Sequence, residues 1–166
     1  SGRALVMEGY LDVARAIEAG ILSAVAPCGT ALTSQQARLL KRQASRAVLC
    51  FDGDDAGVKA TKRSIEIFLE EKMDVRVIAL PGGHDPDTFI RENGRDAFLS
   101  RIEAADPAIE WLARVTAREF DIESPSGKAG YMNALLPALG RIDSGVERAA
   151  WIPRIAQIGR IDPIAA

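Results

Sequence analysis

Short apolar runs alternate with longer amphipathic stretches over the first 90 residues of the chain. The apolar runs predict strands at residues 4–7, 23–26, 47–51 and 75–80. The stretches between them place apolar side chains at helical spacing, which predicts helices at residues 10–19, 34–44 and 56–71. Strands that alternate with helices form a mostly parallel sheet with helices on its faces. The pattern therefore predicts a four-stranded α/β sandwich.

Helix-end signals support these assignments. Gly20 follows the first expected helix, where a C-terminal glycine is common. Thr33 precedes the second, with Gln36 three residues later, which is the spacing of a capping box. Asp55 is placed to cap the third helix, which would begin at Ala56.

Strand signals stop after residue 87. Helical spacing predicts helices at residues 88–93, 96–105, 107–120, 128–139 and 145–159, with Gly94 between the first two. Residues 121–130 combine polar residues with Pro and Gly, which predicts a linker. We expect an α/β domain at residues 1–105 and a helical subdomain at residues 106–166.

Composition narrows the possible functions. The 166 residues include 21 Lys and Arg against 23 Asp and Glu, a net charge of −2, whereas a domain that grips nucleic acid unaided is usually basic. No apolar run reaches the roughly 18 residues of a membrane span, so we expect a soluble, cytoplasmic protein without a membrane partner. The chain starts without Met, and we expect a piece of a larger protein. Cys28 and Cys50 lack the spacing of a metal or disulfide framework, and we expect both to be buried apolar side chains.

Acidic side chains follow three of the expected strands. Glu8 comes directly after the first, Asp52 and Asp54 follow the third, and Asp85 and Asp87 follow the fourth through Pro-Gly-Gly. The carboxyl ends of parallel strands meet at one edge of a sheet, which we call the carboxyl edge, and ligands of such sheets bind there. We therefore expect these five carboxylates to converge.

Converging carboxylates repel one another unless a cation neutralises them. Oxygen ligands without a His or Cys cluster favour Mg²⁺ or Mn²⁺ over zinc, and magnesium leaves positions for substrate phosphates. The pattern thus indicates a phosphoryl-transfer site, with room for two ions. Taken singly, Asp52-Gly-Asp54 is ordinary turn chemistry and Asp87 is placed to cap a helix. Acids after three separate strands favour the site.

Several short motifs follow one another in a distinctive order: Glu-Gly-Tyr-Leu-Asp at 8–12, Gly-Thr-Ala-Leu-Thr at 29–33, Phe-Asp-Gly-Asp-Asp-Ala-Gly at 51–57, Asp-Pro-Asp at 85–87 and Ser-Pro-Ser-Gly-Lys at 124–128. This order resembles the Toprim domain of bacterial DNA primases and the helical subdomain after it. The resemblance covers nearly the whole chain.

The resemblance implies the metal-dependent core of an enzyme that joins ribonucleoside triphosphates into an RNA primer on a single-stranded DNA template during replication. Glu8, Asp52 and Asp54 would be catalytic, and they would bind Mg²⁺, or Mn²⁺ in its place, together with Asp85 and Asp87. Asp12 belongs to the first motif and is either a supporting acid or a solvated one. The family's zinc domain, basic subdomain and replicative-helicase-binding domain are expected outside this chain, so we expect the chain alone to be inactive or weak.

Other interpretations stay open at this point. One helix face carries Arg38, Lys41 and Arg42, and the next helix carries Lys59 and Lys62; either set contacts nucleic-acid phosphates or is a solvated face. A Toprim nuclease or topoisomerase shares the acids but cleaves phosphodiesters. An aspartyl-phosphate phosphatase and a non-catalytic interaction module are weaker alternatives.

Overall fold

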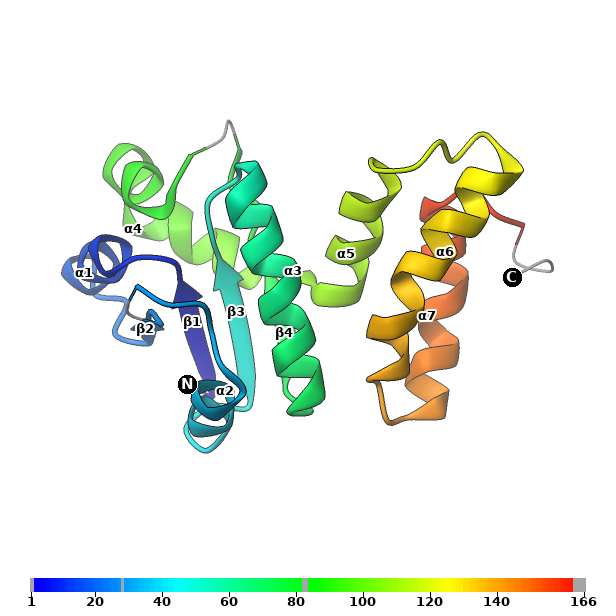
Figure 1. The fold of residues 1–166 in the computed structure, drawn as a ribbon. Helices are drawn as coiled ribbons and strands as arrows, with labels where there is room; N and C mark the ends of the chain where they lie inside the picture. The colour runs from blue at the N-terminus through cyan, green and yellow to red at the C-terminus, as the bar shows by residue number, and fades with distance from the viewer. Residues whose placement is uncertain (1, 28, 82–83, 163–166) are drawn as a thin grey trace. The chain divides into compact units, whose positions relative to one another are not determined.

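The computed structural model describes residues 2–27, 29–81 and 84–162, and the chain falls into two compact units, Ser1–Asp106 and Pro107–Ala166 (Figure 1). The expected division into residues 1–105 and 106–166 stays a prediction, since compactness alone does not show that either part folds by itself. Among the described residues, no helix is both long and apolar enough to cross a membrane. Cys50 is buried with a free thiol, as expected, while Cys28 lies outside the described residues.

The first unit is built on a sheet with the strand order β2-β1-β3-β4-β5, in which β1 pairs in parallel with β2 and β3, and β3 with β4. The mostly parallel α/β sandwich is therefore confirmed. Its elements in chain order are β1 (Arg3–Met7), α1 (Tyr10–Glu18), β2 (Ala24–Val25), α2 (Ser34–Lys41), β3 (Arg46–Cys50), α3 (Asp55–Glu70), β4 (Asp74–Val77), α4 (Pro86–Glu103) and β5 (Asp106–Pro107).

The expected number of four strands was wrong, because β5 adds a fifth at the edge of the sheet. β5 is only two residues long and includes Pro107. Such a segment shows no alternation of apolar and polar side chains, so its pairing depends on the rest of the fold and leaves no pattern in the sequence.

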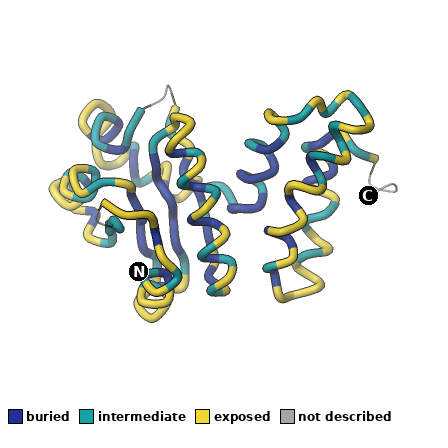
Figure 2. Tube along the Cα trace, in the orientation of Figure 1, coloured by how far each residue is buried: buried dark blue, intermediate teal, exposed yellow. Residues whose placement is uncertain are grey.

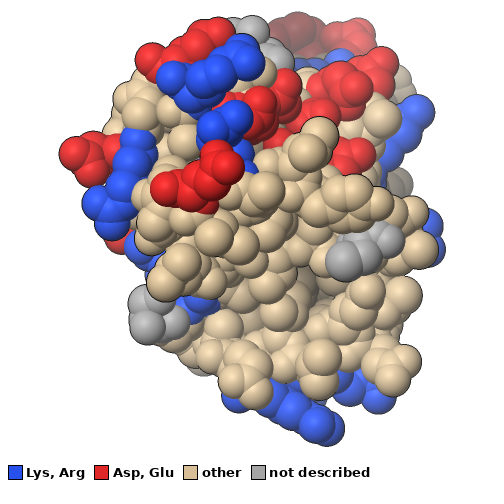
Figure 3. Space-filling view, turned by 90° about the vertical axis from the view of Figure 1, so that its left-hand side faces the viewer, with Lys and Arg blue, Asp and Glu red and all other residues tan. Residues whose placement is uncertain are grey.

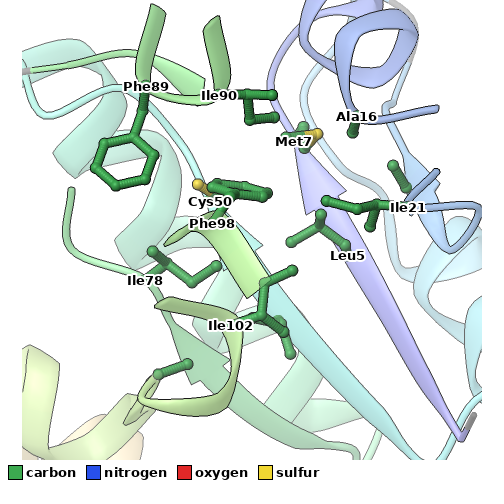
Figure 4. Packing of buried hydrophobic residues seen from close by; sticks show 13 residues of the cluster. Leu5, Met7, Ala16, Ile21, Cys50, Ile78, Phe89, Ile90, Phe98 and Ile102 are labelled. Carbon is green, nitrogen blue, oxygen red and sulfur yellow. The ribbon is translucent and has the colours of Figure 1, made fainter. Parts of the chain in front are cut away.

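One face of the sheet is covered by α1 and α4. Leu5 and Met7 of β1 lie beside Val48 and Cys50 of β3, and all four belong to the same buried cluster as Phe98 of α4 (Figure 4). Side chains two residues apart on a strand point to the same face, which explains this register. Burial of this face fixes β1 and β3, the two strands that carry Glu8 and Asp52 at their ends.

The opposite face is covered by α2 and α3, which contact each other. The intervening strand residues are also buried, among them Val6 and Leu49, and α3 contributes the fully buried Ile65 and Phe68. Because both faces are covered, the strands run as nearly continuous buried segments between partly exposed helices (Figure 2).

Local signals set most helix ends correctly. The Thr33 hydroxyl accepts a hydrogen bond from the Gln36 backbone N–H at 3.3 Å, and the Gln36 side chain accepts one from the Thr33 N–H, so the capping box is confirmed. Gly20 has a φ of 80°, which a residue with a side chain rarely adopts. The expected cap of α3 was wrong by one residue, because Asp54 caps this helix and Asp55 is its first residue.

After residue 85 one helix prediction is confirmed and another needs correction. The two helices expected on either side of Gly94 are both present, and they are joined into the element α4 across a non-helical kink at Gly94, where φ is 81° and ψ is 172°. The linker expected at residues 121–130 is mostly helical, because Ser124 caps α6 (Pro125–Gly140) and Pro125 occupies its first position. A proline there loses no helical hydrogen bond, so Ser-Pro marked a helix start.

The second unit consists, in its described part, of α5 (Ala108–Ala117), α6 and α7 (Gly145–Ile158). Helix α5 contacts both of the others. The fully buried Tyr131 donates a hydrogen bond from its hydroxyl to the Ile155 carbonyl at 2.9 Å, and this bond links α6 to α7. The unit is helical, as the sequence predicts.

Candidate active site at the carboxyl edge

Glu8 stands directly after β1, where the chain leaves the sheet and enters α1. The last four residues of β1 are buried, while Glu8 itself is exposed. The buried strand therefore holds the backbone in place and delivers the carboxylate to solvent at the carboxyl edge.

Asp52 and Asp54 follow β3 in the loop that leads into α3. Asp54 Oδ1 accepts a hydrogen bond from the Gly57 backbone N–H at 2.7 Å and so caps α3. A Cβ atom at Gly57 would lie 2.1 Å from the Asp52 carbonyl oxygen, so the loop folds this tightly only because residue 57 is glycine. The two acids therefore have different roles. Asp54 caps α3, whereas Asp52 is partly buried in the same loop.

Asp85 and Asp87 lie at the start of α4. Asp85 caps this helix by accepting hydrogen bonds from the Thr88 backbone N–H at 2.6 Å and the Thr88 hydroxyl at 3.0 Å, so the cap is Asp85 and not Asp87. The backbone bond is the main reason that the pKa of Asp85 is lowered. Asp87 Oδ1 instead accepts from Arg15 Nε at 2.6 Å.

An open depression of about 400 Å³ brings most of these acids together at the carboxyl edge. Figure 3 shows Asp and Glu side chains gathered in the upper part of one face, the end toward which the strand arrows point in Figure 1. Of the five predicted ligands, Asp54 does not line the depression. We call it the acidic depression, and its lining is Glu8, Gly9, Tyr10, Leu11, Asp12, Gly29, Asp52, Asp85 and Asp87.

Crowding is strongest at Asp52. Partial burial is the main cause that raises the pKa of this carboxyl to about 6, and the charges of neighbouring acids raise it further. Those neighbours are Glu8, Asp12, Asp85 and Asp54. A pKa raised by burial and like charges is common at functional sites, because a bound cation or substrate is needed to relieve it.

Asp12 is an acid whose role the sequence left open, and the structure places it in the acidic depression. Asp12 Oδ2 accepts a hydrogen bond from the Gly9 N–H at 3.2 Å. Burial is the largest cause that raises the pKa of Asp12. Its spacing of four residues from Glu8, at the start of a helix, was the available signal.

The acids fit a divalent cation that is only partly coordinated by protein. Among the described residues, no three His, Cys, Asp or Glu side chains are grouped closely enough to hold an ion by themselves. Magnesium in nucleotide-handling sites uses one or two carboxylates and completes its shell with water and phosphate oxygens. The carboxylate donors and the open depression match that mode rather than a closed structural site.

The candidate nucleic-acid contacts lie in two different places. Arg38 Nε contacts Glu71 Oε1 at 3.1 Å, and Lys41 Nζ donates to the Glu71 carbonyl at 2.7 Å. Glu71 follows the last residue of α3, about 24 Å along the helix from its start beside Asp54. Arg38 and Lys41 thus lie far from the acidic depression, as does Arg42 at the end of α2. Lys59 and Lys62 lie in the first half of α3, nearer the acids.

Two family models match the chain. A model described as Toprim-like matches residues 5–90, which include all five predicted ligands. A model described as the DnaB-helicase binding domain of primase matches residues 109–163. The second match differs from the expectation that the helicase-binding part lies wholly outside this chain.

Curated relatives include DNA primases. The DNA primase of Listeria innocua is 36% identical over 155 residues, which cover 91% of this chain and 24% of the relative. The DNA primase of Escherichia coli K12 is 37% identical over 143 residues, which cover 84% of this chain and 25% of the relative. The chain thus spans about a quarter of the length of these relatives.

Solved structures share the fold. The E. coli primase catalytic core has a TM-score of 0.85 at 32% identity and matches 100% of this chain and 54% of its own. The Aquifex aeolicus primase, described by its zinc-binding and RNA polymerase domains, has a TM-score of 0.77 at 36% identity and matches 98% of this chain and 38% of its own. A DnaG primase catalytic domain described as bound to ssDNA has a TM-score of 0.85 at 32% identity, over 100% of this chain and 54% of its own.

Proposed function

Because this chain belongs to the Toprim-like family and is similar to DNA primases along nearly its whole length, we propose that it is the nucleotidyl-transfer part of a DNA primase. In this role the chain extends an RNA primer with ribonucleoside triphosphates on a single-stranded DNA template. The observation that carries the proposal is the acidic depression, where acids from three separate strand ends crowd around Asp52.

The acids of the depression would hold Mg²⁺, with Mn²⁺ as a substitute. Asp52, Asp87 and Asp85 are the proposed ligands with Glu8, and Asp12 joins them from the first turn of α1. Asp54 remains a proposed ligand through Oδ2, since its Oδ1 caps α3. When bound, magnesium supplies charge neutralisation for the triphosphate and its leaving group.

Glu8 is the proposed proton acceptor. Its carboxylate is exposed in the depression, within reach of a hydroxyl that enters from solvent. The primer 3′ oxygen forms a bond to the α-phosphorus of the nucleotide, the bond from that phosphorus to the bridging oxygen breaks, pyrophosphate leaves, and the hydroxyl proton passes to Glu8. Positioning of the reactants supplies much of the rate, and the buried strands β1 and β3, which end just before Glu8 and Asp52, hold these two acids in place.

The proposal also concerns two partners that would bind outside the acidic depression, the DNA template and the replicative helicase. The chain is slightly acidic, and two of its predicted template contacts, Arg38 and Lys41, are bound to Glu71. We expect other parts of a longer primase to supply most of the affinity for the DNA template, and we expect the isolated chain to make primers weakly or not at all. The replicative helicase is a proposed partner, and the match at 109–163 makes α5 to α7 a candidate contact.

Primer synthesis by the whole primase that contains this chain tests the proposal. We expect Asp52→Asn and Glu8→Gln each to lower the rate of primer synthesis on single-stranded DNA by about 10²-fold or more, because each removes a charge at the reacting centre. Asp96→Asn is the matched control, because the Asp96 side chain is 96% exposed on α4, outside the depression, and we expect it to keep the wild-type rate.

Two results would contradict the proposal. Unchanged primer synthesis in both site variants would show that the acidic depression takes no part in the reaction. Magnesium-dependent cutting of a labelled DNA strand, abolished by Asp52→Asn and accompanied by no primer synthesis, would instead establish the Toprim nuclease alternative.

A further inference from the structure

Arg15 is a basic residue of α1 that contacts the acidic depression. Its Nε donates to Asp87 Oδ1 at 2.6 Å, and its Nη1 donates to Glu18 Oε2 at 2.9 Å. Both side chains of the Arg15–Asp87 pair are about one-third exposed, 38% and 32%. The guanidinium therefore sits at the rim of the depression and bridges a carboxylate of its own helix to one on α4.

The position of this pair matters because Asp87 is also a proposed metal ligand. One carboxylate oxygen of Asp87 accepts a hydrogen bond from Arg15, and the positive charge of the guanidinium offsets part of the negative charge of this carboxylate. A divalent cation that reaches Asp87 meets a carboxylate already shared with a positive charge, and the two cations repel each other. The same pair connects α1, which carries Asp12, to α4, which is capped by Asp85 and carries Asp87 in its first turn.

We propose that Arg15 is a built-in counter-ion that holds Asp87 in the metal-free site and competes with the divalent cation for it. This inference rests on the proposed metal site. Arg15 acts through Asp87 and is a positioning residue, because no contact with a reacting atom is needed for its effect. It allows the acidic depression to form without metal, and it weakens metal binding until substrate phosphates add their own negative charge.

The test measures Mn²⁺ binding to the full 166-residue chain by electron paramagnetic resonance, without nucleotide. We expect Arg15→Gln to bind Mn²⁺ about three- to tenfold more tightly than the wild type, because a nearby positive charge is gone. Arg15→Lys keeps the charge but loses the planar fork that bridges two carboxylates, and we expect an affinity between the two.

Two controls separate the pair from a general charge effect. Arg46→Gln removes a comparable arginine from the Arg46–Asp74 pair, whose side chains are 43% and 48% exposed at the start of the strands, and we expect unchanged Mn²⁺ affinity. In an Asp87→Asn background, we expect Arg15→Gln to change the affinity by less than about twofold, because the competing contact no longer exists.

The outcomes distinguish this inference from the proposed function. Equal or weaker Mn²⁺ binding by Arg15→Gln, beside clear binding by the wild type, would overturn the role of Arg15 and leave the metal site standing. A gain of the same size in the Asp87→Asn background would also overturn it. If neither the wild type nor Arg15→Gln bound Mn²⁺ at millimolar concentration, the metal site itself would fail, and this inference with it.

Discussion

The two edges of the same sheet differ in the charged neighbours of their acidic side chains. At the starts of the strands, which we call the amino edge, acids have basic partners: Arg46 contacts Asp74 at 2.5 Å, and Arg3 contacts Glu103 at 2.5 Å. At the carboxyl edge, acids stand beside acids, and the pKa of Asp52 rises to about 6. Opposite charges therefore stabilise the amino edge, whereas like charges destabilise the carboxyl edge.

The difference between the two edges shows where the fold loses stability for the sake of function. Crowded carboxylates reduce stability unless something cationic joins them, and the buried strands β1 and β3 hold them in place nevertheless. Arg15 relieves this only at Asp87. Residues that break local rules while the rest of the fold obeys them are those expected to act on a ligand.

The largest expected effect comes from Gly57, which lets the loop with Asp52 fold tightly. In Gly57→Val, the new Cβ would lie 2.1 Å from the Asp52 carbonyl oxygen, so the loop or the start of α3 must move. We expect the free energy of unfolding to fall by about 3 kcal/mol or more, measured by urea denaturation.

Gly140→Ala is the control for this change. No atom lies within 4 Å of a Cβ built at this helix-end glycine, and alanine favours helices, so we expect stability to stay equal or to rise by up to about 1 kcal/mol. Equal stability of Gly57→Val and the wild type would show that the carboxyl-edge loop is looser than described.

The next effect concerns the charge of Asp52. Its pKa is raised from 3.8 to about 6 in the folded chain, so folding favours the protonated form. The contribution of Asp52 to the free energy of unfolding is therefore highest below the unfolded pKa, falls as the pH rises from about 4 to about 6, and stays lower above that range. Asparagine does not ionise, so Asp52→Asn lacks this fall.

We expect Asp52→Asn, free of metal, to be about 1–2 kcal/mol more stable than the wild type near pH 7.5, after allowance for solvent screening. At about pH 4 the two proteins should be nearly equal. Urea denaturation across this pH range measures the difference. A difference that does not change with pH would mean that crowding at Asp52 does not affect folding.

A smaller effect is expected in the helical unit, at the hydrogen bond that links α6 to α7. Tyr131→Phe removes the hydroxyl that donates to the Ile155 carbonyl at 2.9 Å and leaves that buried carbonyl with less hydrogen bonding. We expect a loss of about 1 kcal/mol in thermal or urea unfolding. Tyr10→Phe, at a side chain 66% exposed, should leave stability unchanged, and an equal loss in both would contradict the packing described for α6 and α7.

The smallest effect is expected at the amino edge. Arg46→Gln breaks the Arg46–Asp74 pair, but exposed ion pairs contribute only about 0–1 kcal/mol. Urea unfolding should show a loss in this range that shrinks further in high salt. A loss above about 2 kcal/mol would mean that this edge, too, depends strongly on its charges.

Sequence patterns predicted what depends on local chemistry. The apolar runs predicted β1 and β3, and Thr33 with Gln36 predicted the start of α2. The acids that follow three of the expected strands predicted the location of the acidic depression. Features that depend on distant pairing were missed. Strand β5 has no pattern of its own, and α6 was partly taken for a linker, because Ser-Pro-Ser-Gly is typical of both turns and helix starts.

The roles of the individual acids were harder to predict than their location. In each Asp-x-Asp pair one carboxylate caps a helix, and the spacing alone does not say which; the structure shows Asp54 and Asp85. Arg15 reaches the depression only because α1 packs beside α4, a contact between segments about 70 residues apart. That contact is tertiary and leaves no mark in a single sequence.

The most direct test of the account is anomalous scattering from crystals of this chain soaked in Mn²⁺, compared with crystals of Asp52→Asn. We predict manganese peaks in the acidic depression, within about 2.0–2.3 Å of carboxylate oxygens that include Asp52, and loss of the peak nearest residue 52 in the variant. Peaks only elsewhere on the surface, or an empty depression at millimolar Mn²⁺, would contradict the claim that the carboxyl edge is a metal-dependent site.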